Sequence, residues 1–139
     1  MQIEKIMTES VHTVAPTITL GELRKVFADV SYHHLLVVEH NRLVGVISDR
    51  DVLRMSSPAL DGGFDGDEMS PQDQALLQRQ AVDFMATRLV TARPDTLIDT
   101  AAILLLENNI SCLPVVGEQT TVAGIVTWKD MLKYYVYIR

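Results

Sequence analysis

The chain repeats itself, and this repeat constrains the fold more than any other feature of the sequence. A shift of 78 positions, which becomes 79 after one inserted residue, aligns residues of the same kind in the same order. The aligned pairs include Met7/Met85, Thr13/Thr91, Pro16/Pro94, Leu35/Leu113, Gly45/Gly124, Ser48/Thr127, Asp51/Asp130 and Leu53/Leu132. A fixed internal shift is the signature of a repeat architecture. The chain therefore contains two copies of one unit.

The two copies occupy residues 1–55 and 81–139, and residues 56–80 form an insertion between them. A unit of about 55 residues buries a smaller share of its surface than a larger domain does, and it is only marginally stable alone. We therefore expect the copies to pack on each other as one domain with pseudo-two-fold symmetry. The 139 residues, 47% of them hydrophobic, are enough for a shared core without a disulfide or a metal.

The hydrophobic period within the first copy alternates between helix and strand. Thr19 and Glu22 form a capping-box pattern ahead of apolar residues at helical spacing through Val30. Two short β-branched runs follow at 35–39 and 43–48, separated by the turn 40–42, and they predict a hairpin. A second helix is expected to begin near Asp49.

The second copy repeats this pattern, with its cap one residue early at Thr96-Leu97-Ile98-Asp99. The apolar helix then runs through Leu106, the strands are expected at 113–116 and 122–126, and the last helix begins at Trp128. Each unit is thus strand, helix, strand, strand, helix. The predicted fold class is α/β (α+β): two β-α-β-β-α repeats packed sheet to sheet.

The insertion opens with turn-forming residues and an acidic glycine tract at 61–68. That tract departs from the EF-hand pattern, because Gly63 occupies a ligand position and Gln72 stands where a bidentate Glu is needed. We interpret it as a solvated loop. Ser70-Pro71 then predicts a capped helix through about Arg79.

Composition excludes several classes of protein. Of the net charge of −6, −4 falls in residues 55–80, and no basic stripe suits duplex nucleic acid. Cys112 is the one cysteine, which excludes an internal disulfide and fits a reducing compartment. No apolar run approaches the roughly 20 residues of a membrane helix, and no signal peptide is apparent. We expect a cytoplasmic protein with no membrane partner.

Templates for catalysis and metal binding are absent from the sequence. It contains no GxGxxG, GxxxxGK[ST], HExxH or GxSxG motif. His33 and His34 are adjacent at the entry to a strand, where neighbouring side chains point to opposite faces. Either one packs under the strand and the other is exposed, or both serve a ligand. We expect no metal, no catalytic residue and no enzymatic activity.

One motif stands out in both copies: a buried strand that runs into S/T-x-x-D at the start of a helix. It occurs as Ser48-Asp49-Arg50-Asp51 and Thr127-Trp128-Lys129-Asp130. The pattern is also that of a capping box, so a purely structural role is one interpretation. The other is a nucleoside phosphate site, in which the helix start binds an anion and the carboxylate accepts the ribose hydroxyls.

Further motifs accompany these two in the same order. They are Ile6-Met7-Thr8, Thr13-Val14-x-Pro16, His34-Leu35-x-Val37-Val38 and Gly45-Val46-Ile47-Ser48-x-x-Asp51 in the first copy, and Phe84-Met85, Thr91-x-x-Pro94, Cys112-Leu113-Pro114-Val115-Val116 and Gly124-Ile125-Val126-Thr127-x-x-Asp130 in the second. The series resembles a tandem pair of CBS domains, the Bateman module, and is most similar to small stand-alone bacterial CBS-pair proteins. The resemblance covers nearly all of the chain outside residues 55–80.

This resemblance implies a regulatory module whose two clefts bind adenosine-type ligands such as AMP, ADP, ATP or S-adenosylmethionine, with no other cofactor. It implies that Asp51 and Asp130 hold the ribose, with Ser48 and Thr127 beside the phosphates. The tripeptide Tyr32-His33-His34 would face the Thr127/Asp130 cleft, and Ile110-Ser111-Cys112 would face the Ser48/Asp51 cleft.

The two expected clefts differ chemically. The Thr127/Asp130 cleft gains His33, His34 and Lys129, which favours a phosphorylated ligand there. The Ser48/Asp51 cleft has Arg50 but otherwise small or apolar partners, so a less charged ligand or none is expected. We interpret Cys112 as a small buried hydrophobe rather than a reactive thiol.

Two departures from the family pattern bear on these clefts. Leu36 stands where the first Leu-Pro-Val-Val strand would have proline, so the backbone entering one cleft is expected to differ. The long acidic insertion is able to lie over a cleft and repel phosphate.

Tyr134, Tyr135 and Tyr137 gather at the C-terminus. They either pack the last helix on the core or form a self-association surface, since tyrosine is enriched at interfaces. Because modules of this kind commonly pair, we expect a homodimer. The predicted function is a regulatory sensor in signal transduction whose ligand shifts the packing of the repeats and so acts on a regulated protein. The alternative is a ligand-free dimerisation or scaffold module for a partner protein.

Overall fold

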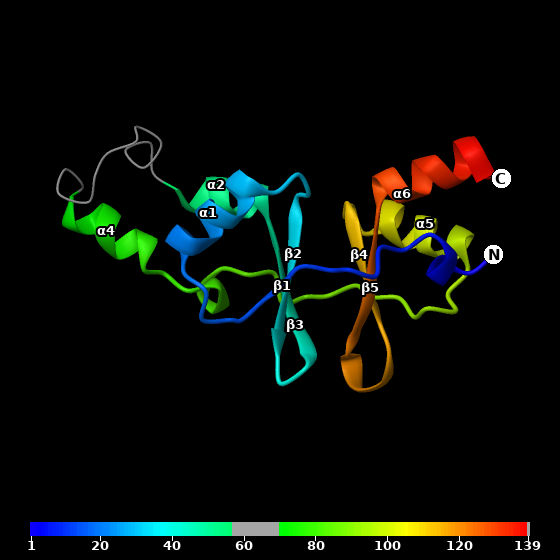
Figure 1. Cartoon of the computed structure of the whole chain (residues 1–139), viewed down its shortest axis with the longest axis horizontal. Helices are drawn as coiled ribbons and strands as arrows, with labels where there is room; N and C mark the ends of the chain where they lie inside the picture. The colour runs from blue at the N-terminus through cyan, green and yellow to red at the C-terminus, as the bar shows by residue number, and fades with distance from the viewer. Residues whose placement is uncertain (57–69, 139) are drawn as a thin grey trace.

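A computed structural model describes residues 1–56 and 70–138 of the chain. Figure 1 shows the strands of the two repeats side by side at the centre, with the helices of each repeat outside them. The first repeat contains β1 (Thr13–Val14), α1 (Leu20–Asp29), β2 (His34–Glu39), β3 (Arg42–Ser48) and α2 (Asp49–Met55). The second contains α5 (Ile98–Glu107), β4 (Cys112–Val116), β5 (Val122–Thr127) and α6 (Trp128–Lys133), followed by the π-helical turn η5 (Tyr134–Ile138).

The predicted mixed fold of two similar repeats is confirmed, with one difference in the second sheet. The first sheet has the order β1-β2-β3, with β1 parallel to β2 and β2 antiparallel to β3. The second has β4 antiparallel to β5, and its expected first strand is reduced to a single parallel bridge between Ala92 and Val115. The backbone N–H of Leu36 donates to the carbonyl of His12 at 3.3 Å, which helps to pair β1 with β2. The equivalent residue of the second repeat is Pro114, which has no N–H for such a hydrogen bond.

The cap predicted for the first helix of each repeat is present in the first copy but not in the second. Thr19 caps α1 by accepting the N–H of Glu22, and Glu22 in turn accepts the N–H of Thr19. The predicted cap at Thr96 is wrong, because α5 begins after Leu97 without a side-chain cap. The hydroxyl of Thr96 accepts the Arg93 N–H at 2.9 Å instead. The first N–H of α5, from Ile98, reaches the carbonyl of Met1 at 3.0 Å.

The described part of the insertion lies at the outer edge of the first repeat. Ser70 caps α4 (Pro71–Leu77) as predicted, although this helix ends two residues before Arg79. In Figure 1, α4 lies beyond α1 and away from the junction of the two repeats. This part of the insertion therefore does not cover the space between the repeats, and the acidic tract at 61–68 falls outside the described residues.

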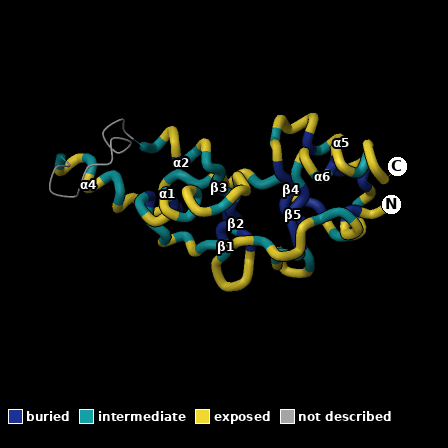
Figure 2. Tube along the Cα trace, turned by 45° about the horizontal axis from the view of Figure 1, so that its top comes forward, coloured by how far each residue is buried: buried dark blue, intermediate teal, exposed yellow. Residues whose placement is uncertain are grey.

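Three apolar clusters form the core, and Figure 2 shows the buried residues concentrated along the strands. One cluster lies in each repeat, between its sheet and its helices. The third joins the two sheets and contains Leu36, Leu43, Cys112, Val116 and Ile125. The expected sheet-to-sheet packing of the repeats is therefore present.

The segments that lead into the two repeats, residues 3–7 and 81–85, are exchanged: the first packs on the second repeat and the second on the first. Ile3 is fully buried in the cluster of the second repeat, and Ala81 is fully buried in that of the first. The two crossings use equivalent hydrogen bonds: the N–H of Ile3 reaches Thr96 O and that of Ala81 reaches Ile18 O, both at 2.8 Å. Each sequence copy therefore completes the core of the other.

The exchange explains why methionine and glycine recur together in the two copies. Met7 packs over Gly124, and Met85 packs over Gly45. A Cβ atom at Gly124 would lie 2.8 Å from both the sulfur of Met7 and the carbonyl oxygen of Thr8. At Gly45 it would meet the side chain of Met85, with Cγ at 2.8 Å. Each glycine thus allows the lead-in segment of the other repeat to lie directly against the strand.

Candidate functional site

One continuous cavity of about 1400 Å³ lies between the repeats. Ten of the residues predicted from the sequence line it: Tyr32, His33, His34, Ser48, Arg50, Ile110, Ser111, Thr127, Lys129 and Asp130. The expectation of two separate clefts is therefore corrected, because groups assigned to both of them face a shared space. The cavity is larger than the roughly 300–1,000 Å³ of most ligand pockets.

Asp51 and Cys112 are the two predicted residues that do not line this cavity. Oδ2 of Asp51 accepts the Ser48 N–H at 2.9 Å, and Oδ1 lies 4.0 Å from the guanidinium of Arg54. Cys112 is 6% exposed within the cluster that joins the sheets. Burial raises the pKa of its thiol to about 12, so this side chain is a small hydrophobe at neutral pH.

The cavity is not symmetric, although the repeats are. The segment that leads into β1 contributes Thr8, Ser10, Val11 and His12 to its wall. None of the equivalent residues around 86–90 lines it. The cavity is therefore built mainly around the Thr127 motif, and the Ser48 motif contributes from the opposite side.

The Thr127 motif combines a helix cap with a carboxylate at the cavity wall. Asp130 accepts the backbone N–H of Thr127 at 2.9 Å and its hydroxyl at 3.1 Å, both through Oδ2. Thr127 accepts the Asp130 N–H at 3.4 Å, which closes the capping box at the start of α6. Ser48 and Asp51 form the same box on α2. Capping is therefore real in both copies, and it leaves Asp130 at the cavity.

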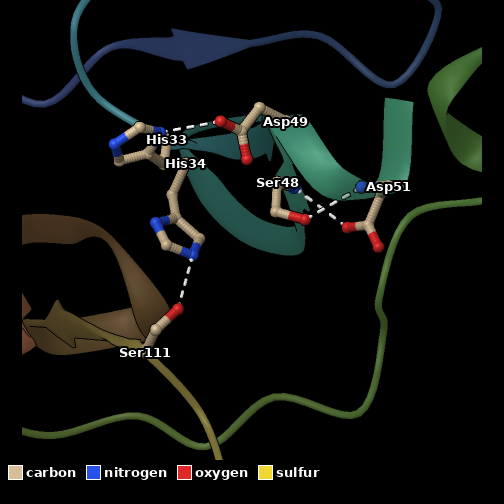
Figure 3. Close-up of polar contacts among 6 residues, drawn as sticks. All are labelled: His33, His34, Ser48, Asp49, Asp51 and Ser111. Carbon is tan, nitrogen blue, oxygen red and sulfur yellow. Dashed lines mark hydrogen bonds and ion pairs between the residues drawn. The ribbon is translucent and has the colours of Figure 1, made fainter. Parts of the chain in front are cut away.

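Both histidines line the cavity, with His33 exposed and His34 half-buried, and their side chains point to different partners. In Figure 3 the imidazole of His33 points at Asp49, with Nδ1 2.7 Å from Oδ2. His34 points toward the second repeat, and its Nε2 lies 3.0 Å from the hydroxyl of Ser111. This hydrogen bond links side chains 77 positions apart and connects the two repeats across the cavity.

Burial lowers the pKa of His34 below its ordinary value of 6.5, although the nearby charge of Asp49 opposes this effect. The side chain is therefore neutral in the folded protein at pH 7 and holds a single ring proton, which either nitrogen can carry. Its contact with Ser111 is a neutral hydrogen bond.

Folding stability is expected to fall as the pH drops from about 7.5 to about 5.5, in part through His34. Its folded-state pKa is the lower one, so the unfolded chain takes up the proton first, and stability is lost as the pH falls through the unfolded value. The measurement is the unfolding free energy by urea titration across this range. His34→Gln should give a shallower pH dependence than the wild type, and parallel curves for the two proteins would contradict this assignment.

Two cations stand at equivalent places in the two motifs, Arg50 and Lys129, and both line the cavity. Within residues 1–56 and 70–138 neither forms an ion pair, whereas Asp49 is paired with His33. The cavity wall therefore offers positive charge to an anion.

Several residues of the cavity wall are not among those predicted from the sequence. Trp128 and Asp49 follow the motif hydroxyls directly, and their place inside S/T-x-x-D was the available signal. His12, whose Nδ1 contacts the hydroxyl of Tyr32, lies 20 positions away from it. No sequence motif links His12 to Tyr32, because the two residues come into contact only in the folded chain.

Across the described ranges, no three His, Cys, Asp or Glu side chains gather in a way that could hold a metal ion. None of the helices described here is long and apolar enough to cross a bilayer.

Comparison with known proteins identifies the family. The model of the CBS domain matches residues 3–57 and 81–137. Protein MJ1225 of Methanocaldococcus jannaschii is 27% identical over 133 residues, which are 96% of this chain and 46% of that protein. The inosine-5'-monophosphate dehydrogenase of the same organism is 27% identical over 96% of this chain. The chain thus spans less than half of the length of these relatives, and only 23% of the dehydrogenase.

Solved structures of CBS domain proteins have the same fold as this chain. The CBS domain pair of protein MJ0100, in complex with 5'-methylthioadenosine and S-adenosyl-L-methionine, superposes with a TM-score of 0.77 at 26% identity, covering 97% of this chain and 95% of that one. The protein CBSX2 in complex with AMP gives 0.78 at 25% identity, covering 96% and 95%. The family model matches the chain twice, and the solved CBS pairs superpose on its two repeats. The chain therefore belongs to the CBS domain family and is a tandem CBS pair.

Proposed function

We propose that the chain is a regulatory sensor that binds an adenosine-type ligand, AMP, ADP, ATP or S-adenosylmethionine, in the cavity between its repeats. The observation that carries this proposal is the convergence of Thr127, Lys129 and Asp130 with Tyr32, His33 and His34 on one cavity. Two neighbouring structures hold AMP, or methylthioadenosine and S-adenosylmethionine. These neighbours support the ligand class but do not select one member of it.

The chemistry of the wall supports a role for each group in this proposal. Asp130 accepts the ribose hydroxyls, and the cations Lys129 and Arg50 balance phosphate charge. Ser48, Ser111 and Thr127 supply hydroxyls, and Ile110 and Tyr32 supply apolar surface. Asp51 acts as a helix cap, and Cys112 belongs to the core between the sheets. A ligand held by both repeats favours one packing of them over another, which gives the regulated protein a change to recognise.

Thermal unfolding with added ligand tests the proposal. AMP, ADP, ATP, S-adenosylmethionine and NAD are added separately at about 1 mM. A ligand with a Kd of about 10 μM should add about 2.7 kcal/mol of stability, and so raise the midpoint by several degrees. If none of the five shifts the midpoint, an adenosine-type ligand of this affinity is excluded, and the scaffold function takes its place.

We also propose that the chain forms a homodimer through its C-terminal turn. Tyr134 and Tyr135 pack against the core of the second repeat, and the hydroxyl of Tyr135 donates to Asp99 at 2.6 Å. Val136 and Tyr137, in contrast, are 66% and 82% exposed. Exposed apolar residues gathered on one surface favour an interface with another protein.

Val136→Glu is therefore expected to raise the dimer dissociation constant at least tenfold in sedimentation velocity runs. Val82→Glu is the control, because Val82 is also half exposed but lies in the segment that packs on the first repeat. Equal dissociation constants for both variants and the wild type would place the interface elsewhere.

A further inference from the structure

Trp128 is the one tryptophan of the chain, and it lies at the wall of the cavity. It is the first residue of α6 and follows the motif hydroxyl of Thr127 directly. Although tryptophan is highly buried on average, this side chain remains 37% exposed. An aromatic ring that is partly bare within a cavity offers a flat surface to whatever occupies it.

The ring is held in place by the chain of its own repeat. The indole N–H donates to the carbonyl of Ile110 at 3.1 Å. The backbone N–H of Trp128 donates to the carbonyl of Ser111 at 3.2 Å. With its polar edge and its backbone both fixed, the ring meets a ligand without a large further loss of conformational entropy.

The equivalent residue of the first repeat makes the same backbone contact but has opposite chemistry. Asp49 donates its N–H to the carbonyl of His33 at 2.9 Å, as Trp128 does to Ser111. Its side chain, however, forms an ion pair with His33. The two sides of the cavity therefore differ: one has a polar pair, and the other has an anchored indole.

We propose that the indole of Trp128 is the stacking platform for the base of the bound ligand. This inference rests on the proposed function, and it adds that a flat aromatic base is recognised here and not only ribose and phosphate. Stacking on an aromatic side chain typically changes affinity by about ten- to a hundredfold. Because every base has a flat aromatic face, stacking does not distinguish one base from another. The platform therefore favours ligands that carry a base over phosphate esters that lack one.

The test combines calorimetry with the fluorescence of this single tryptophan. The full chain is titrated with AMP and, separately, with ribose 5-phosphate, which has the same sugar phosphate but no base. We expect AMP to bind and to change the fluorescence of Trp128, and ribose 5-phosphate to bind at least tenfold more weakly. Trp128→Phe keeps an aromatic face and should bind AMP within about threefold of the wild type. Trp128→Leu keeps bulk without the aromatic face and should bind at least tenfold more weakly.

The outcomes separate this inference from the function on which it rests. If the wild type binds none of AMP, ADP, ATP and S-adenosylmethionine in the calorimeter, the proposed function itself is overturned. If AMP binds, but Trp128→Leu binds it within twofold of the wild type, the stacking role alone is overturned. Circular dichroism and the unfolding midpoint of each variant establish that it is folded before its affinity is compared.

Discussion

Gly124→Ala is expected to lower the free energy of unfolding by about 3 kcal/mol, at the upper end of the range for overpacked sites. The new Cβ would lie 2.8 Å from the carbonyl oxygen of Thr8, and backbone cannot move aside as a flexible side chain can. Thr8 and Ile125 also exchange two backbone hydrogen bonds of 2.9 Å at this point, which the displacement would stretch. Urea titration measures the loss, and a thermal scan should show a fall of roughly 10 °C in the midpoint.

The repeat supplies graded controls for this substitution. Gly45→Ala places its Cβ against the side chain of Met85 alone, so a smaller loss is expected there. Gly117→Ala meets nothing closer than the hydroxyl of Thr121 at 3.4 Å and should change stability least. If all three variants lose the same amount, the close approach of the exchanged segment is not what requires glycine at position 124.

Asp130→Asn is expected to weaken binding of the adenosine-type ligand by about ten- to a hundredfold. The substitution replaces a charged acceptor by a neutral amide, and hydrogen bonds to charged groups contribute about 1.5–3 kcal/mol each. Calorimetric titration with whichever nucleotide stabilises the wild type gives the ratio of the two dissociation constants. Because the amide oxygen can still accept the Thr127 N–H, the helix cap should survive and the protein should remain folded.

Asp51→Asn is the matched control, since the same residue stands in the same motif and closes the same capping box. Its carboxylate does not line the cavity, so ligand affinity should change by less than about threefold. The two variants should lose similar, small amounts of stability. An equal loss of affinity in both variants would mean that the carboxylate of Asp51 also holds ligand, and no loss in either would leave both carboxylates as helix caps alone.

Much of the fold could be predicted because its determinants are local. The cap at Thr19, the hairpin around residues 40–42 and the cap at Ser70 each depend on neighbouring residues, and each is present. The cap at Thr96 was predicted wrongly because a distant chain end, at Met1, satisfies the first N–H of α5. The exchange of Ile3 and Ala81 could not be predicted either, since an internal shift shows which residues are alike but not which copies touch.

The candidate site could likewise be predicted only where it depends on neighbouring residues. The S/T-x-x-D motifs and the tripeptides could be recognised from spacing, and most of their residues line the cavity. Asp130 lines the cavity and Asp51 does not, although both close the same capping box, because the segment that leads into β1 contributes to the wall and its equivalent does not. Spacing does not encode this asymmetry. The joining of two expected clefts into one depends on how the sheets pack on each other. The hydrogen bond between His34 and Ser111 arises in the same way, between residues of different repeats.

The exchanged lead-in segments also bear on the order in which the protein is assembled during synthesis. When residues 1–55 have left the ribosome, their core still lacks Ala81 and Met85, and Ile3 has no partner to bury it. Because domains generally fold as units once complete, the first repeat has to wait for the start of the second. The fold is therefore completed late and jointly, and a nascent chain that stops before residue 81 holds neither core.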